Sequence, residues 1–199
     1  YRPLDGELRQ LAEMIGSAER ITVFCGIGAR EAHDEVVRLA AMLKAPVAYT
    51  FKAKMEVQYD NPYEIGMTGL LGLPSAYGAM HESDLLLLLG TDFPYDCFLP
   101  SECRIAQVDI RPERIGRRAR VELGLAGDVK ETLQALFPML RERSDRVFLD
   151  RQLKIYGALC DDMAAVASKR GSAGNIAPEY VATLIAVSYT HLTLPTIRL

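Results

Sequence analysis

The chain has 199 residues, of which 49% are hydrophobic and 25% are charged, and its formal net charge at pH 7 is −3. This length allows one complete hydrophobic core with additional elements, and the composition is typical of globular proteins. The slightly acidic balance argues against nucleic acid and against an anionic membrane surface as partners.

The cysteines and histidines form no pattern typical of a metal site. The four cysteines show no Cys-x-x-Cys pairing, and the three histidines are isolated from one another. We therefore expect free thiols in a cytoplasmic protein, with neither a signal peptide nor a transmembrane segment. Because the chain starts at Tyr1 without a Met, we interpret it as a fragment.

The first part of the chain alternates helical and strand patterns. Asp5 is expected to cap an initial helix with apolar residues at helical spacing. Strands are expected at 21–25 and 46–50, connected by a tight turn and a helix over 30–43. These elements form a βαβ unit, whose crossover is expected to be right-handed.

Five consecutive leucines at 85–89 predict the central strand of the fold. A run without polar alternation is buried on both faces, and this one is far shorter than the roughly 20 residues that span a membrane. It ends at Gly90, and Pro94 prevents regular continuation. Ligands of parallel sheets lie beyond the carboxyl ends of the strands, so residues 90–94 are expected at a ligand site. An ordinary loop is the alternative.

The rest of the chain continues the alternation. The other expected elements are a strand at 64–67, a turn at 68–72, a helix at 74–82, a strand at 104–109, a helical turn at 112–116, a strand at 121–126, and a helix capped by Asp128 with Leu133, Leu136 and Leu140 on one face. Six strands with helical connections predict an α/β fold with a doubly wound, six-stranded parallel sheet of Rossmann-like type.

The composition also suggests how the chain divides. Residues 1–145 are expected to form one domain, and 146–174 a linker helix that ends at a glycine-containing break over 171–174. Residues 175–186 are interpreted as the truncated start of a further domain. Residues 187–199 resemble translated sequencing-adapter sequence and are treated as a non-native tail.

The Gly26-x-Gly28 turn follows the first strand, where a doubly wound fold offers backbone N–H groups to a diphosphate. It is not the complete dinucleotide fingerprint, because Glu31 occupies the third glycine position. Thr50 and then Lys52 stand where an acidic residue is expected after the second strand. These departures argue against a standard nicotinamide site, and a purely structural turn is the alternative.

Asp109 ends the fifth strand, so its carboxylate is expected to point from the sheet edge towards ribose hydroxyls. A cap for the helical turn that starts at Pro112 is the alternative. Arg111 is a candidate for reaching a phosphate, although the basic run to which it belongs is also typical of a solvated face. No nucleophile elbow, Cys–His pair or separated pair of carboxylates is recognisable, so no catalytic residue is assigned.

Several segments together resemble the central domain of the thiamine-diphosphate enzymes. The most specific are Tyr-Asp-Asn-Pro-Tyr at 59–63, Gly-Met-Thr-Gly at 66–69 and Gly-Thr-Asp-Phe-Pro-Tyr at 90–95. The segments at 25–28, 44–47 and 108–112 also match, and the resemblance covers about residues 4–186. Within the family the chain is most similar to the pyruvate dehydrogenase (quinone) group, also called pyruvate oxidases.

The resemblance implies that this domain binds FAD rather than NAD, in an extended pose along the strand ends. Carried over position by position, it places Asp109 on the adenosine ribose. The expected cofactor-binding residues are Gly26, Gly28, Thr68, Gly69, Leu70, Leu71, Thr91, Asp92, Phe93, Pro94, Tyr95 and Asp109.

The resemblance also implies an activity for the full-length enzyme, namely oxidative decarboxylation of pyruvate with electrons passed through FAD to a quinone. Thiamine diphosphate and Mg²⁺ would be held outside this fragment. Gly127-Asp128-Val129 only partly matches the family's Gly-Asp-Gly magnesium motif, and we interpret Asp128 as a helix cap. The full-length protein is expected to be a homotetramer on the inner face of the cell membrane, attached through a C-terminal tail that this chain lacks.

Two other classes remain open. One is a related thiamine enzyme, such as acetolactate synthase or a 2-oxoacid decarboxylase, in which the domain binds flavin without redox chemistry or binds none. The other is a non-catalytic nucleotide-binding module. The Asp-Asn-Pro-Tyr and Phe-Pro-Tyr segments favour the pyruvate-oxidising enzyme over the related thiamine enzymes.

Overall fold

The computed structural model describes residues 1–169 and 175–193. The chain divides into two compact units, with the boundary between Ile155 and Tyr156. The first unit contains the complete sheet and all the predicted site residues. The glycine-containing break expected at 171–174 lies outside the described residues.

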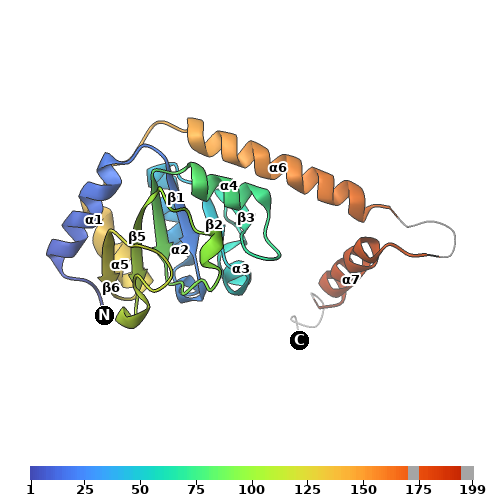
Figure 1. Cartoon of the computed structure of the whole chain (residues 1–199). Coiled ribbons are helices and arrows are strands. Elements are labelled where there is room, and N and C mark those ends of the chain that lie inside the picture. Colours follow the sequence, from blue (N-terminus) through green and yellow to red (C-terminus); the bar gives the residue numbers. More distant parts are fainter. Residues whose placement is uncertain (170–174, 194–199) are drawn as a thin grey trace. The chain divides into compact units, whose positions relative to one another are not determined.

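The first unit is built on one parallel sheet (Figure 1). Its strands are β1 (Ile21–Cys25), β2 (Val47–Tyr49), β3 (Glu64–Met67), β4 (Leu85–Leu89), β5 (Arg104–Asp109) and β6 (Leu123–Ala126). Their order is β3-β2-β1-β4-β5-β6, and every neighbouring pair is parallel. The predicted doubly wound, six-stranded parallel sheet is confirmed. The order reverses between β1 and β4, which makes this junction the topological switch point.

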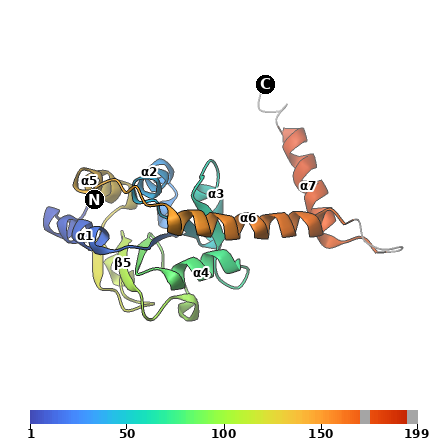
Figure 2. The same ribbon diagram turned by 90° about the horizontal axis from the view of Figure 1, so that it is seen from above.

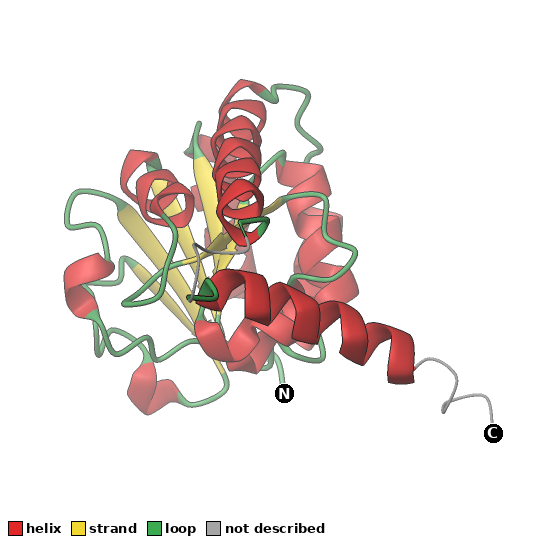
Figure 3. Ribbon diagram, turned by 90° about the vertical axis from the view of Figure 1, so that its right-hand side faces the viewer, coloured by secondary structure: helices red, strands yellow, loops and turns green. Residues whose placement is uncertain are grey.

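Helices cover both faces of the sheet (Figures 2 and 3). They are α1 (Asp5–Ser17), α2 (His33–Leu43), α3 (Lys54–Val57), α4 (Pro74–Glu82), α5 (Val129–Leu136) and the start of α6 (Val147–Ala167). Helices α1, α2 and α5 contact one another on one face, and α4 lies on the other. On α4's side, Glu82 accepts a hydrogen bond from Gln152 at 2.9 Å, which holds the first turns of α6 to this unit.

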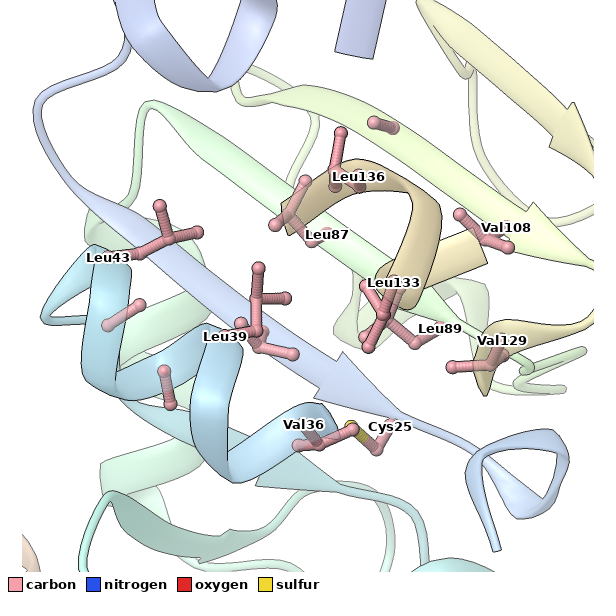
Figure 4. Packing of buried hydrophobic residues seen from close by; sticks show 14 of the residues in the cluster. Cys25, Val36, Leu39, Leu43, Leu87, Leu89, Val108, Val129, Leu133 and Leu136 are labelled. Carbon is pink, nitrogen blue, oxygen red and sulfur yellow. The ribbon is translucent and has the colours of Figure 1, made fainter. Parts of the chain in front are cut away.

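The leucine strand β4 contributes to the core on both faces. Leu85, Leu87 and Leu89 belong to the cluster formed with α1, α2 and α5 (Figure 4), whereas Leu86 and Leu88 point to the opposite face. All five are at most 3% exposed, and burying each stabilises the fold by about 1.5–3 kcal/mol. This double burial explains why the strand has no polar alternation.

Several helix boundaries differ from the predicted ones for local reasons. Asp5 is not the cap of α1, because the helix starts after Leu4, whose N–H donates to Glu7 at 2.8 Å. Helix α2 starts at His33 rather than at residue 30, because a 3₁₀ turn occupies Ile27–Ala29. Helix α5 ends before Leu140, whereas the cap by Asp128 is confirmed, since its carboxylate accepts the Glu131 N–H at 3.1 Å.

The second unit contains the rest of α6 and helix α7 (Pro178–Thr193). Helix α7 includes residues 187–193 of the expected tail, and residues 194–199 lie outside the described part of the chain. Within the described residues, no helix is both long and apolar enough to cross a membrane.

The loops after β1 and β4 touch through glycine backbones at the switch point. The Gly28 N–H donates to the Gly90 carbonyl at 2.9 Å, and the Gly26 N–H donates to the Leu89 carbonyl at 2.8 Å. A Cβ on Gly26 would lie 2.4 Å from the Gly90 oxygen, and Gly90 itself has a φ of +60°. Side chains at these positions would push the two loops apart.

We therefore predict that Gly90→Ala lowers the free energy of unfolding by about 2–4 kcal/mol, the sum of a left-handed backbone penalty and a steric clash. The matched control is Gly78→Ala in α4, where a Cβ meets nothing within 4 Å and the change should stabilise the helix by about 0.5–1 kcal/mol. Urea denaturation measures both. Equal stability of the two variants would show that the close approach of the loops is not a structural requirement.

Candidate functional site

A cavity of about 550 Å³ opens at the carboxyl edge of the sheet. Residues that follow β1, β2, β3 and β4 line it, so it lies at the switch point where doubly wound folds bind their ligands. Nine of the twelve predicted site residues line this cavity, namely Thr68, Gly69, Leu70, Leu71, Thr91, Asp92, Phe93, Pro94 and Tyr95. The structure thus brings together two segments, 68–71 and 91–95, that are separated in the sequence by strand β4 and helix α4.

The loop after β3 presents apolar side chains at the cavity. Gly69 has a φ of +119°, and its carbonyl accepts the Gly72 N–H at 2.8 Å, so the chain turns sharply. Leu70 and Leu71 follow this glycine and are 71% and 72% exposed. Two large leucines held outward beside a cavity provide an apolar contact surface for a planar ring system.

The loop after β4 supplies an aromatic wall. Phe93 is buried and packs edge-to-face against Phe24, with ring centroids 5.2 Å apart, and against Tyr95 at 5.4 Å. A Cβ on Gly69 would lie 3.4 Å from the Phe93 ring. The Phe93 ring of the loop after β4 therefore lies beside Gly69 of the loop after β3.

Gly26 and Gly28 do not line the cavity, and their N–H groups already donate to the carbonyls of Leu89 and Gly90. These N–H groups are therefore not directed at the cavity. Their hydrogen bonds support the alternative interpretation of the sequence, in which the turn is purely structural. Ile27, between the two glycines, does line the cavity. Contact between the glycines and a cofactor stays a prediction.

Asp109 lies at the end of β5 but also does not line the cavity. Its side chain is buried, and Oδ1 accepts the Arg111 N–H at 2.9 Å, an arrangement that supports its own loop. Burial raises the pKa of Asp109, while the Arg111 N–H and the nearby Arg114 charge lower it. This is a local turn contact and not a cap of the helical turn at Pro112–Arg114, whose N-cap is Arg111 without a side-chain hydrogen bond; a contact with ribose stays a prediction.

The cavity has a cationic wall that was not predicted from the sequence. Arg114 and Arg118 line it, whereas Arg111, the candidate chosen from the sequence, does not. Asp92 faces these arginines, since its carboxylate lies 3.0 Å from Arg118 Nε, 3.0 Å from Arg117 and 4.0 Å from Arg114. These ion pairs could not be recognised from the sequence, because Asp92 and the arginines are more than twenty positions apart.

None of the four cysteines lines this cavity. Burial raises the pKa of the Cys25 thiol strongly, and burial also raises the pKa of Cys103 to about 11. All four cysteines are free. Among the described residues, no group of three or more His, Cys, Asp or Glu side chains is arranged to hold a metal ion.

A larger cavity of about 1200 Å³ lies at the opposite, amino-terminal edge of the sheet. It is lined by the end of α1, the start of β1 and residues 139–145, and the Arg143 guanidinium donates there to the Ala18 carbonyl at 2.7 Å. Ligands of doubly wound sheets bind at the carboxyl edge, so the smaller cavity is the candidate site.

The fold and the cavity together define a Rossmann-like α/β domain with a candidate ligand site at the carboxyl edge of its sheet. Residues 8–136 match the family described as "Thiamine pyrophosphate enzyme, central domain". The chain belongs to this family.

The relatives are longer proteins. An uncharacterized 42.6 kDa protein in the isoamylase 3' region of Pseudomonas amyloderamosa is 50% identical over 155 residues, which are 78% of this chain and 39% of that protein. The putative thiamine pyrophosphate-containing protein YdaP of Bacillus subtilis is 35% identical over 74% of this chain and 26% of its own length. The chain thus spans less than half of either relative.

Relatives with named activities fall into two groups. An acetolactate synthase of Mycobacterium avium is 29% identical over 90% of this chain and 30% of its own length. A pyruvate oxidase of Lactiplantibacillus plantarum is 28% identical over 67% of this chain and 23% of its own length. The two identities are nearly equal, so the comparisons do not favour one activity over the other.

We predict that Asp109→Asn raises the melting temperature at pH 7. The raised pKa means that the folded state favours the neutral carboxyl, so ionised Asp109 costs stability as pH rises above its ordinary range. Asparagine keeps an oxygen for the Arg111 N–H without ionising. The difference from wild type should disappear at about pH 3, where the wild-type carboxyl is neutral too.

The control variant is Asp109→Ala, which also removes the hydrogen-bond acceptor. Loss of this hydrogen bond, worth about 1 kcal/mol, should make its melting temperature about 2–4 °C lower than that of Asp109→Asn at pH 7. Thermal scans monitored by circular dichroism measure all three proteins. A lower melting temperature for Asp109→Asn than for wild type at pH 7 would contradict the assigned cost of the buried charge.

Proposed function

We propose that this chain is the FAD-binding central domain of a thiamine-diphosphate-dependent enzyme that oxidatively decarboxylates pyruvate, of the pyruvate dehydrogenase (quinone) or pyruvate oxidase group. The observation that carries the proposal is the cavity at the switch point, with nine of the predicted site residues on its walls. Its volume lies within the range of about 300–1,000 Å³ that is common for ligand pockets.

The cavity walls fit the chemistry of a dinucleotide. Arg114 and Arg118 offer guanidinium groups to phosphates, and Leu70, Leu71 and Tyr95 offer exposed apolar surface to a ring system. When bound, FAD would supply the two-electron chemistry, and the residues of this chain would hold and orient it. Thiamine diphosphate, Mg²⁺, pyruvate and quinone would interact with parts of the enzyme outside this chain.

Acetolactate synthase, or another thiamine enzyme that acts on 2-oxoacids, is the second candidate. The similarity to the mycobacterial acetolactate synthase supports it as strongly as the similarity to the pyruvate oxidase supports the first. In the full-length enzyme, pyruvate added without oxygen should bleach the flavin absorbance if the first proposal holds. Acetolactate formation with the flavin remaining oxidised would favour the second.

For the 199-residue chain itself, we predict that ADP binds within about tenfold of FAD, while FMN barely competes. The contacts described here surround the cavity of one domain, so the flavin ring would lack the further burial that neighbouring domains of the full enzyme provide. An aromatic group buries some 150–250 Å², at roughly 25 cal/mol per Å². Isothermal titration calorimetry with the three ligands measures this. Tight FMN binding without ADP binding would contradict the proposed site.

A further inference from the structure

The charge of the cavity wall exceeds what its own acidic residue neutralises. Among the residues that line the cavity, Lys52, Arg114 and Arg118 are cationic and Asp92 is the only acid. The same carboxylate also pairs with Arg117, which lies outside the lining. One carboxylate therefore faces three guanidinium groups, and positive charge remains uncompensated at the cavity.

The two arginines on the wall keep hydrogen-bond donors available. Arg118 uses Nε for its 3.0 Å bond to Asp92, and the structure records no acceptor for its terminal nitrogens among the described residues. Arg114 approaches the same carboxylate only to 4.0 Å. Both side chains are about one-third exposed, so an anion entering the cavity can reach their planar donor groups.

A buried glutamine holds the arginine loop in place. Gln107 in β5 is 4% exposed, and its Nε2 donates to the carbonyls of Thr91 at 3.1 Å and of Arg114 at 3.3 Å. Its Oε1 accepts the Gly116 N–H at 2.9 Å. One side chain thus ties the loop after β5 to the loop after β4, and the arginines are presented to the cavity from a fixed backbone.

We propose that Arg114 and Arg118 form the diphosphate-binding subsite of this cavity, with Asp92 as the residue that positions them. The inference rests on the proposed nucleotide-binding function and extends it to specific residues. The ligand chemistry is a diphosphate group, supplied either by ADP or by the ADP half of FAD. Arginine suits this group because its fork of donors binds two phosphate oxygens at once.

The test compares two double variants of the 199-residue chain by calorimetry. In R114M/R118M, affinity for ADP and for inorganic diphosphate should fall at least tenfold, while affinity for uncharged adenosine stays within twofold of wild type. The matched control, R111M/R120M, removes two positive charges from the same loop at exposed positions that do not line the cavity, and should change ADP affinity less than threefold. Equal losses of ADP affinity in both double variants would show that the effect depends only on the net charge of the loop, and would overturn the proposed subsite.

A single variant and the salt dependence of wild-type binding keep the subsite testable even if the double variant misfolds. Arg114→Met removes the 4.0 Å contact to Asp92 and the charge near Asp109 but no recorded side-chain hydrogen bond, so its melting temperature should stay within about 2–4 °C of wild type while inorganic diphosphate binding weakens. Wild-type affinity for inorganic diphosphate should also decrease as salt is raised, because partly exposed charges are screened.

The outcomes separate this inference from the proposed function. Wild-type FAD binding that R114M/R118M leaves unchanged would overturn the subsite and leave the flavin site standing. Arginine-dependent binding of inorganic diphosphate, without binding of FAD or ADP, would support the subsite and contradict the proposed function. Absence of inorganic diphosphate binding to the wild-type chain at millimolar concentration would overturn the subsite.

Discussion

The candidate site depends on the close contact between the loops that follow β1 and β4. Their backbones meet through Gly26, Gly28 and Gly90, with the Gly28 N–H donating to the Gly90 carbonyl at 2.9 Å. The sheet order reverses at this junction, so the chain leaves the two strands in opposite directions and a cavity opens beyond their ends. Without the glycines, the loops would separate and the cavity walls would lose their alignment.

The loops after β3, β4 and β5 each contribute a different property to the cavity. The loop after β3 presents exposed leucines, the loop after β4 contributes aromatic rings, and the loop after β5 contributes arginines. Apolar and cationic side chains in the lining of one cavity suit a ligand that has both a ring system and a phosphate group. Under the proposed function, the domain would orient a nucleotide cofactor, and the redox chemistry would belong to that cofactor.

The sheet was predictable from the sequence because buried parallel strands leave a direct pattern, as the leucine run of β4 shows. Residues 68–71 and 91–95 were predictable as neighbours because both follow strands that end at the same edge. The start of α1 was not predictable, because its cap depends on the Glu7 carboxylate, which accepts the Leu4 N–H. The roles of Arg114 and Arg118 were also hidden, because their positions depend on Gln107 linking two loops across the sheet edge.

Chemical-shift mapping of the ¹⁵N-labelled chain with FAD tests the central claim most directly, because it distinguishes the cavity at the carboxyl edge of the sheet from the larger cavity at the amino-terminal edge. The account predicts that amide shifts change at residues 68–71, 91–95 and 114–118, around the smaller cavity. Amides around Ala18, Lys44 and Arg143, at the larger cavity, should stay unchanged. Shifts confined to that amino-terminal edge, with none at the switch point, would contradict the account.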